Sequence, residues 1–291
     1  MRTVLNELEV VAAGTRLPAA GETTGVALTA TGPSWRGARV DLPAFAADPR
    51  LDPGLPASLR RRIDRFSAIA LLAVSSVLDT LAPDQRPPRQ RIGVFLANTR
   101  AGWAYGAPEL GLLVDRGPEA MHAYQATAWF PAAAQGEATI ALDLRGCAKT
   151  TAGRESGFAE ALWLARDALE RHAVDLALVG AAESLVSDFV LRDWAPGSPL
   201  PDTGPAEGAV VFAVRRPGTG NGARLRGPRH TPGPTASADG GGEWVPTLAA
   251  ADRLHAALAD DRPNRTIRVA LGGGYDIDVT HPGDEIQNET D

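Results

Sequence analysis

The chain has 291 residues, 44% of them hydrophobic, so it can bury the core of one large domain or of two small ones. Its formal net charge is -6 and its arginines are scattered among acidic residues, which disfavours a nucleic-acid or anionic-membrane partner. The single Cys147 excludes an internal disulfide and a multi-cysteine metal site, and the start of the chain has neither a secretory signal nor a membrane span, so we expect a cytoplasmic protein.

The first quarter of the chain predicts loops followed by one strong helix. A short apolar run from Leu8 to Ala13 precedes a region rich in Gly, Pro and Thr, in which we expect a few short strands at most. Residues 58–81 then predict an amphipathic helix. Its apolar stripe consists of Ile63, Phe66, Ile69, Ala70, Ala73, Val74 and Val77. Prolines end this helix, and residues 91–98 (RIGVFLAN) predict a buried strand, so the order of elements favours an α/β fold.

Residues 99–142 give a weaker pattern. Residues 99–117 mix Gly, Pro and aromatic residues, and they predict a loop region with one short helix. Tyr124, Trp129 and Phe130 then lie close together in a chain with only 5% aromatic residues. Such a cluster indicates either core packing or the wall of a pocket.

The stretch from Leu144 to Ser184 has the layout of a reactive turn in an α/β protein: a turn, a helix from Phe158 to Arg171 and a buried strand. The glycine spacing of a hydrolase nucleophile turn fails around Ser156, so we expect Ser156 to cap the helix by accepting a backbone N–H. A lone cysteine such as Cys147 is more often inert packing than a nucleophile, although a cysteine–histidine pair formed in space stays open.

The remaining third predicts a strand at residues 207–216, a flexible linker or long disordered loop from Pro217 to Glu243, a helix at residues 247–260 and two short strands joined by a glycine turn. The Gly272–Gly274 run lacks the residues of a phosphate loop. No metal spacing is found among the five histidines, and we expect no metal. They are His122, His172, His230, His255 and His281.

Five segments, in register from Arg60 to Val214, resemble the β-ketoacyl synthases, the condensing enzymes of the thiolase fold. RRRIDRFSAIALLAVSSVL resembles the family's helix that begins R-R-M-D-R-F-S, and RIGVFLAN resembles the strand after it. FPAAAQGEATIALDLRG, ALWLARDALERHAVDLALVGAAES and AEGAVVFAV resemble the following helices and strands. The resemblance implies a thiolase-like α/β fold with a largely complete N-terminal half at residues 1–216. Residues 217–243 would be the linker, and residues 244–291 a shortened C-terminal half packed in the same domain.

The departures from the family pattern bear on activity. In active members a cysteine lies at the N-terminus of the helix that follows the Arg-Gly pair, where the helix dipole favours its thiolate. Arg154 or Glu155 occupies that position here, depending on the end from which one counts. The family's two later histidine motifs also have no counterpart, so the resemblance implies that the chain has no condensing activity alone.

The resemblance therefore implies a chain-length-factor-type subunit that pairs with a catalytic ketosynthase in fatty-acid or polyketide (polyene-type) biosynthesis and needs no cofactor. Tyr124, Gln125, Trp129 and Phe130 would face the partner's acyl pocket. An acidic acyl carrier protein could dock through the partner, or on the cluster Arg60, Arg61, Arg62 and Arg65, although composition alone favours a solvated helix face for this cluster. Two alternatives stay open: an acyl-transfer or thioester-hydrolysing enzyme that uses Cys147 or Ser156, and an acyl-carrier-binding protein.

Overall fold

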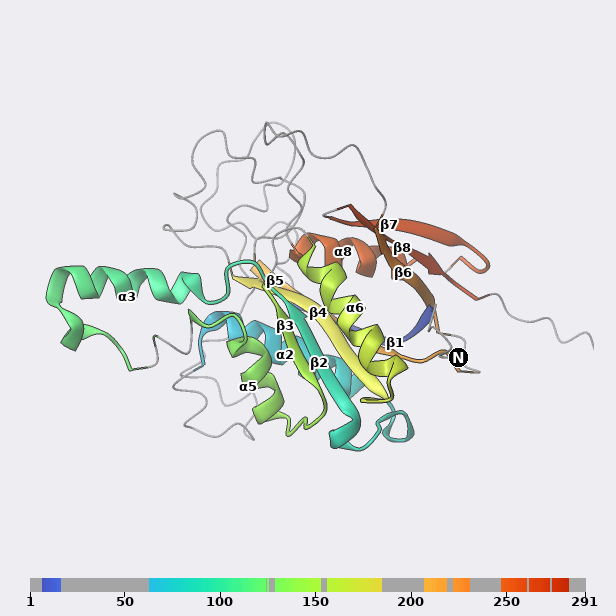
Figure 1. Cartoon of the computed structure of the whole chain (residues 1–291), viewed down its shortest axis with the longest axis horizontal. Helices are drawn as coiled ribbons and strands as arrows, with labels where there is room; N and C mark the ends of the chain where they lie inside the picture. Colours follow the sequence, from blue (N-terminus) through green and yellow to red (C-terminus); the bar gives the residue numbers. More distant parts are fainter. Residues whose placement is uncertain are drawn as a thin grey trace, which may run out of the picture.

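The computed structural model describes residues 7–16, 63–123, 125, 129–152, 156–184, 207–218, 222–230, 247–260, 262–272 and 274–282. Within these ranges, eight strands form one mixed sheet in the order β3-β2-β4-β5-β1-β6-β8-β7 (Figure 1). Of the strand pairs formed by the described residues, only β2–β3 and β2–β4 are parallel. The strands are β1 (Glu7–Arg16), β2 (Ile92–Ala97), β3 (Ala148–Thr151), β4 (Leu176–Ser184), β5 (Glu207–Arg215), β6 (Arg224–His230), β7 (Thr266–Gly272) and β8 (Tyr275–Thr280).

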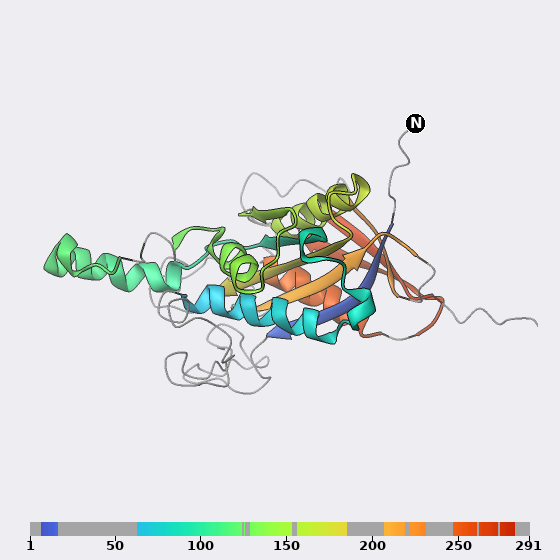
Figure 2. The same ribbon diagram turned by 90° about the horizontal axis from the view of Figure 1, so that it is seen from below.

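Helices cover both faces of the sheet. Helices α2 (Arg65–Thr80) and α5 (Ala133–Ala141) pack on one face, and α6 (Gly157–Glu170) and α8 (Thr247–Leu258) pack on the other. Helix α8 contacts β4, β5 and β7, so the sheet curls around it. Helix α3 (Trp103–Arg116) projects away from these layers (Figures 1 and 2). None of the described helices is long and apolar enough to cross a membrane.

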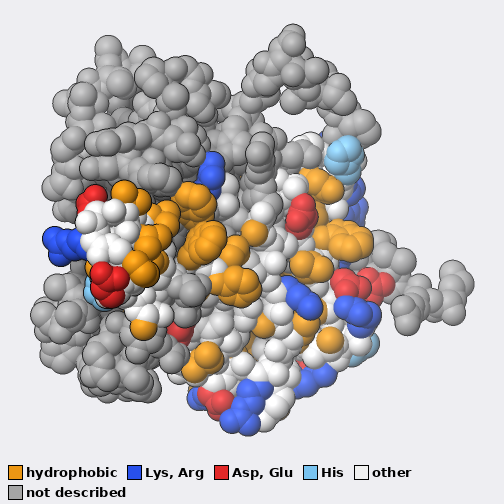
Figure 3. Space-filling model, turned by 60° about the vertical axis from the view of Figure 1, so that its left-hand side comes forward, with side chains coloured by type: hydrophobic (Ala, Val, Ile, Leu, Met, Phe, Trp, Pro, Cys, Tyr) orange, Lys and Arg blue, Asp and Glu red, His pale blue; other side chains and the backbone are white. Residues whose placement is uncertain are grey.

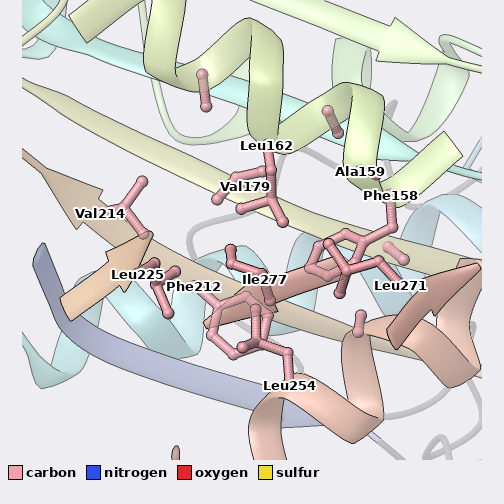
Figure 4. Close-up of a cluster of buried hydrophobic side chains, with 14 of the residues drawn as sticks. Phe158, Ala159, Leu162, Val179, Phe212, Val214, Leu225, Leu254, Leu271 and Ile277 are labelled. Carbon is pink, nitrogen blue, oxygen red and sulfur yellow. The ribbon is translucent and has the colours of Figure 1, made fainter. Parts of the chain in front are cut away.

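Each helical layer has its own hydrophobic core. On the α6/α8 face, Phe158 of α6 and Phe212 of β5 meet with their ring centroids 6.1 Å apart, and Leu254 of α8 packs beside them (Figure 4). On the α2/α5 face, the predicted stripe of α2 is buried from Phe66 onward. Because β4 and β5 lie between the two layers, both are almost entirely buried, as their continuous apolar runs indicate.

The α2 helix begins later than its apolar stripe predicts. Asp64 caps it by accepting a hydrogen bond from the backbone N–H of Ser67 at 3.1 Å, so the helix starts at Arg65 and Ile63 precedes it. Residues 58–62 of the predicted helix, like residues 17–57, lie outside the described part of the chain.

Two sequence predictions differ from the structure. Residues 103–116, predicted as mostly loop, form the 14-residue helix α3 despite Pro108. The predicted structureless linker from Pro217 to Glu243 contains β6, because its backbone pairs with β1 and β8 even though only Leu225 contributes a large side chain to the core. In both places tertiary contacts override a weak local pattern. Short 3-10 turns also occur, at η2 (Pro83–Gln85), η3 (Arg89–Arg91) and η4 (Pro118–Ala120).

Candidate functional site

The carboxyl ends of the parallel strands β2, β3 and β4 lie together, and we call this side of the sheet its C-terminal edge. Helices α6 and α8 both begin there. In α/β folds this is the edge at which ligands are usually bound. The Thr151 hydroxyl at the end of β3 donates to the carbonyl oxygen of Gly157 at 2.7 Å and so joins β3 to the start of α6. A Cβ on Gly157 would lie 2.8 Å from a methyl carbon of Thr247, so the starts of α6 and α8 are in close contact.

The positions of Arg154 and Glu155 immediately precede α6, but residues 153–155 lie outside the described part of the chain. Ser156 is the N-cap of α6, as predicted. Its predicted hydrogen bond is wrong: the hydroxyl accepts no capping N–H and instead donates to the Glu160 carboxylate at 2.6 Å. A carboxylate in the first turn suits the positive end of the helix dipole, and Ser156 is its polar neighbour.

Cys147 lies at the opposite end of β3. It is partly buried, and its carbonyl oxygen accepts from the N–H of Val94 at 3.0 Å. Thr151 is four residue steps along the strand from Cys147, which corresponds to about 13 Å. The Cys147 thiol is therefore too far from the start of α6 to take the place of a nucleophile there.

A buried glutamate that the sequence analysis did not single out lies at the centre of this edge. Glu183, in β4, is fully buried, and its Oε1 accepts from the Thr247 hydroxyl at 2.5 Å. The Thr99 hydroxyl lies 3.4 Å from that of Thr247. Burial raises the pKa of Glu183 to about 7, against the opposing effect of hydrogen bonding from Thr247, from Thr99 and from the backbone N–H of Arg100. A charged residue that closes a wholly apolar run was the signal for it in the sequence.

The next residue of β4 serves the other face of the sheet. Ser184 donates to Oε1 of the buried Glu207 at 3.0 Å. Arg65, the first residue of α2, donates to both oxygens of the same carboxylate at 2.8 Å. Arg65 is thus paired with a buried carboxylate while its own side chain stays 33% exposed, and its role in carrier docking stays a prediction. Arg60, Arg61 and Arg62 lie outside the described residues.

The four residues predicted to face a partner's pocket do not share one environment. Trp129 and Phe130 are exposed to 56% and 61%, whereas Gln125 is buried and donates to the Gly106 carbonyl oxygen at 3.5 Å. Tyr124 lies outside the described residues. The exposed pair lies just before α5, the helix that packs on β3, and Figure 3 shows hydrophobic side chains gathered on the side of the molecule where α3 and α5 lie.

The described histidines serve structural contacts. Nδ1 of His122 lies 2.7 Å from the Glu109 carboxylate of α3, and Nδ1 of His172 lies 2.6 Å from the Arg216 guanidinium. His281 is within 3.1 Å of the Ala257 carbonyl oxygen. In the described part of the chain, no three His, Cys, Asp or Glu side chains come together as a metal site.

Residues 25–222 match the profile of the beta-ketoacyl synthase N-terminal domain. The tetracenomycin polyketide synthase ketoacyl synthase beta subunit of Streptomyces glaucescens is 29% identical over 166 residues, which is 56% of this chain and 41% of that protein. Across the curated relatives it matches, the chain spans between 31% and 60% of their length.

Solved structures show the same fold. The ishigamide ketosynthase/chain length factor has a TM-score of 0.65 at 19% identity, covering 95% of this chain and 99% of that chain. A ketosynthase in complex with its chain length factor from Xenorhabdus doucetiae has a TM-score of 0.57 at 14% identity, covering 94% and 99%. A type II acyl-carrier protein complex with its ketosynthase has a TM-score of 0.57 at 24% identity, covering 74% and 64%. The predicted thiolase-like α/β fold is thereby confirmed.

Proposed function

This chain belongs to the β-ketoacyl synthase family, and we propose that within it the chain is a non-catalytic subunit of the chain-length-factor type. In this proposal it forms a heterodimer with a catalytic ketosynthase of type II polyketide assembly and helps to shape that enzyme's acyl pocket. The relatives with polyketide synthase names and the ketosynthase/chain-length-factor structures of similar size support the choice of partner.

The missing thiol is the observation that carries the proposal. Condensation by a ketosynthase requires an acyl thioester on a cysteine, and the sequence places Arg154 or Glu155 before the helix that would present it. The chain's one cysteine, Cys147, lies at the other end of β3, about four residues of strand away. Neither Arg nor Glu can form the thioester, so the chain needs a partner that supplies one.

An open sheet edge and an exposed apolar surface support the pairing. Strand β3 is the last strand of the sheet and pairs only with β2 among the described strands, so its outer edge can accept another chain. Exposed hydrophobic side chains lie beside that edge and along α3, and such side chains are common at protein interfaces. They are Leu110, Val114, Trp129, Phe130 and Ile140.

Co-expression with the ketosynthases of the same genome tests the proposal. We expect one ketosynthase with an intact cysteine to co-purify with this chain and to lose condensing activity without it. Trp129→Asp combined with Phe130→Asp should raise the dissociation constant at least about 100-fold, because exposed aromatic anchors often carry 2 kcal/mol or more each.

Trp163→Asp is the matched control. Trp163 is exposed to 53%, close to the value for Trp129, but it lies on α6 on the opposite face of the sheet. We expect this variant to bind the ketosynthase like the parent chain. Equal loss of binding in the control and in the Trp129/Phe130 variant would refute the interface, and a chain that binds none of the ketosynthases would refute the subunit role.

The same preparation separates the enzymatic alternative. A chain that hydrolyses acyl-carrier thioesters alone, and that loses this activity in Cys147→Ala or Ser156→Ala, would be an enzyme in its own right. We expect no turnover above the rate of the spontaneous reaction, because Arg154 or Glu155 holds the place of the family's nucleophile and Cys147 lies at the other end of β3. Binding of an acyl carrier protein in the absence of any ketosynthase would instead favour the carrier-binding alternative.

A further inference from the structure

The most unusual part of the fold is the arm formed by α3 and the chain that returns from it, residues 103–123. The helix projects from the C-terminal edge of the sheet and packs chiefly against the turn η4 (Figures 1 and 2). The Glu109 carboxylate binds both the backbone N–H of His122 at 2.9 Å and its ring nitrogen at 2.7 Å, which joins the outgoing helix to the returning chain. Because both residues of this pair belong to the arm, the pair does not set the direction in which the arm projects. That direction depends on the connection through which the arm leaves the sheet.

The arm leaves the sheet through the short connection Thr99–Gly102 between β2 and α3. Ala101 in this connection is buried and has φ 49, in the left-handed region that a residue with a side chain rarely adopts. Such a conformation is unfavourable and persists only where surrounding contacts hold it. Gly102 follows it directly and is the N-cap of α3.

One buried carboxyl group faces this connection. The Thr99 hydroxyl lies 3.4 Å from that of Thr247, and the backbone of Thr99 and Arg100 faces the fully buried carboxyl group of Glu183 at the end of β4. Its Oε1 also binds the hydroxyl of Thr247, the first residue of α8, at 2.5 Å, and its Oε2 has no partner at hydrogen-bond distance. The carboxyl thus joins the sheet, the start of α8 and the base of the arm.

The returning side of the arm has a separate tie. The Asn98 side-chain amide donates to the carbonyl oxygen of Pro131 at 3.0 Å. This bond joins the returning chain to the residue that precedes the Thr99–Gly102 connection. The connection itself is joined to the buried carboxyl through Thr99 and Thr247.

We propose that Glu183 is the positioning residue of the α3 arm: it holds the strained Thr99–Gly102 connection in one conformation and so fixes the direction in which the arm projects. Without the carboxyl, the buried Thr247 hydroxyl loses its acceptor, the contact between Thr247 and Thr99 is no longer held in place, and Ala101 can relax to an ordinary conformation. This inference goes beyond the proposed function, since it concerns the geometry of the arm whatever the arm contacts.

Distance measurement between two spin labels tests the proposal. One label is placed on the arm at Val114→Cys, which is 84% exposed, and one on the body at the exposed Asp84→Cys, in a Cys147→Ser background. We expect a narrow distance distribution in the parent chain and a broadened or shifted one in Glu183→Ala. An unchanged distribution in folded Glu183→Ala would overturn the proposal.

A second variant and a matched control complete the test. If Glu183→Ala does not fold, Glu183→Gln carries the same two outcomes, because its amide keeps the volume but only one of its two terminal atoms can accept a hydrogen bond. Glu9→Gln is the control: Glu9 is equally buried but lies in β1 and binds Arg215 and Arg224. It should leave the distribution unchanged, and broadening of the same size there would reduce the effect of Glu183 to general loss of stability and overturn the proposal.

Binding to a co-purifying ketosynthase extends the test and rests on the proposed function. We expect Glu183→Gln to weaken that binding at least about 10-fold and Glu9→Gln to leave it unchanged. Since the spin-label distances need no partner, an arm that loosens in a chain that binds no ketosynthase would refute the subunit role and leave the positioning role standing.

Discussion

The buried carboxyl of Glu183 should make the stability of this protein fall as the pH rises. The perturbation is Glu183→Gln, which keeps the size of the side chain and removes its titration. Burial raises the pKa from 4.5 in a solvated chain to about 7 in the folded protein. The folded protein therefore keeps a proton that the unfolded chain releases, so this group's contribution is complete below about pH 4.5 and is lost as the pH rises through about 7.

The magnitude follows from the two pKa values. For a single group with these values, the free energy of unfolding changes by about 2.5 kcal/mol between about pH 5 and pH 8, as an order of magnitude. Other titrating groups are common to both proteins and cancel in the difference. The free energy of unfolding of Glu183→Gln, relative to the parent chain, should therefore rise by about that amount over this range.

Urea unfolding at a series of pH values measures the difference. Glu9→Gln serves as the reference, because burial opposes ionisation of Glu9 but its bonds with Arg215 and Gly218 outweigh burial and lower its pKa. Its folded and unfolded values both lie below pH 5, so its effect on stability should be constant across the range. Parallel pH profiles for the parent and Glu183→Gln would show that Glu183 is ionised in the folded protein and would refute the reasoning.

Three further predictions concern other parts of the molecule. Gly180→Ala should destabilise the fold by several kcal/mol in denaturant unfolding, because the new Cβ would lie 2.2 Å from the Val210 carbonyl oxygen; near-parent stability would contradict the close approach. Arg65→Met should cost about 3 kcal/mol by stranding the buried Glu207, and adding Glu207→Gln should restore most of it; independent, additive effects would contradict the pairing. Cys147→Ser should leave the activity of the co-purified ketosynthase unchanged in a condensation assay, and a loss would assign chemistry to this thiol.

The sequence predicted the helices and strands whose buried side chains recur with a fixed period along the chain. The stripe of α2 and the run Leu176–Ser184 predicted a helix and a buried strand, because each buries a face with a fixed period. Helix α3 and strand β6 were missed, since each has few buried side chains of its own and exists because other segments bond to it. The bond between Glu109 and His122 for α3 and the pairing of β6 with β1 are both set by the tertiary structure.

The sequence could predict only those features of the site that depend on the order of residues along the chain. Counting along the chain finds Arg154 or Glu155 in place of a nucleophile and separates Cys147 from that place. It cannot find Glu183, because its partner Thr247 is 64 positions away. For the same reason Arg65 was interpreted as a surface charge: the carboxylate that it binds lies 142 positions later in the chain.

The two polar residues that end β4 have a consequence for strand register. The rest of the strand is apolar on both sides, so hydrophobicity alone would allow it to slide by one residue without exposing anything. A slide that moved Glu183 to the place of Ser184 would put it beside Glu207 and leave two buried carboxylates to share Arg65. It would also put Ala182, which has no side-chain acceptor, opposite the Thr247 hydroxyl. A one-residue slide of β4 would therefore leave polar groups badly paired on both faces of the sheet. The two polar residues at the end of β4 thus fix its register against β5.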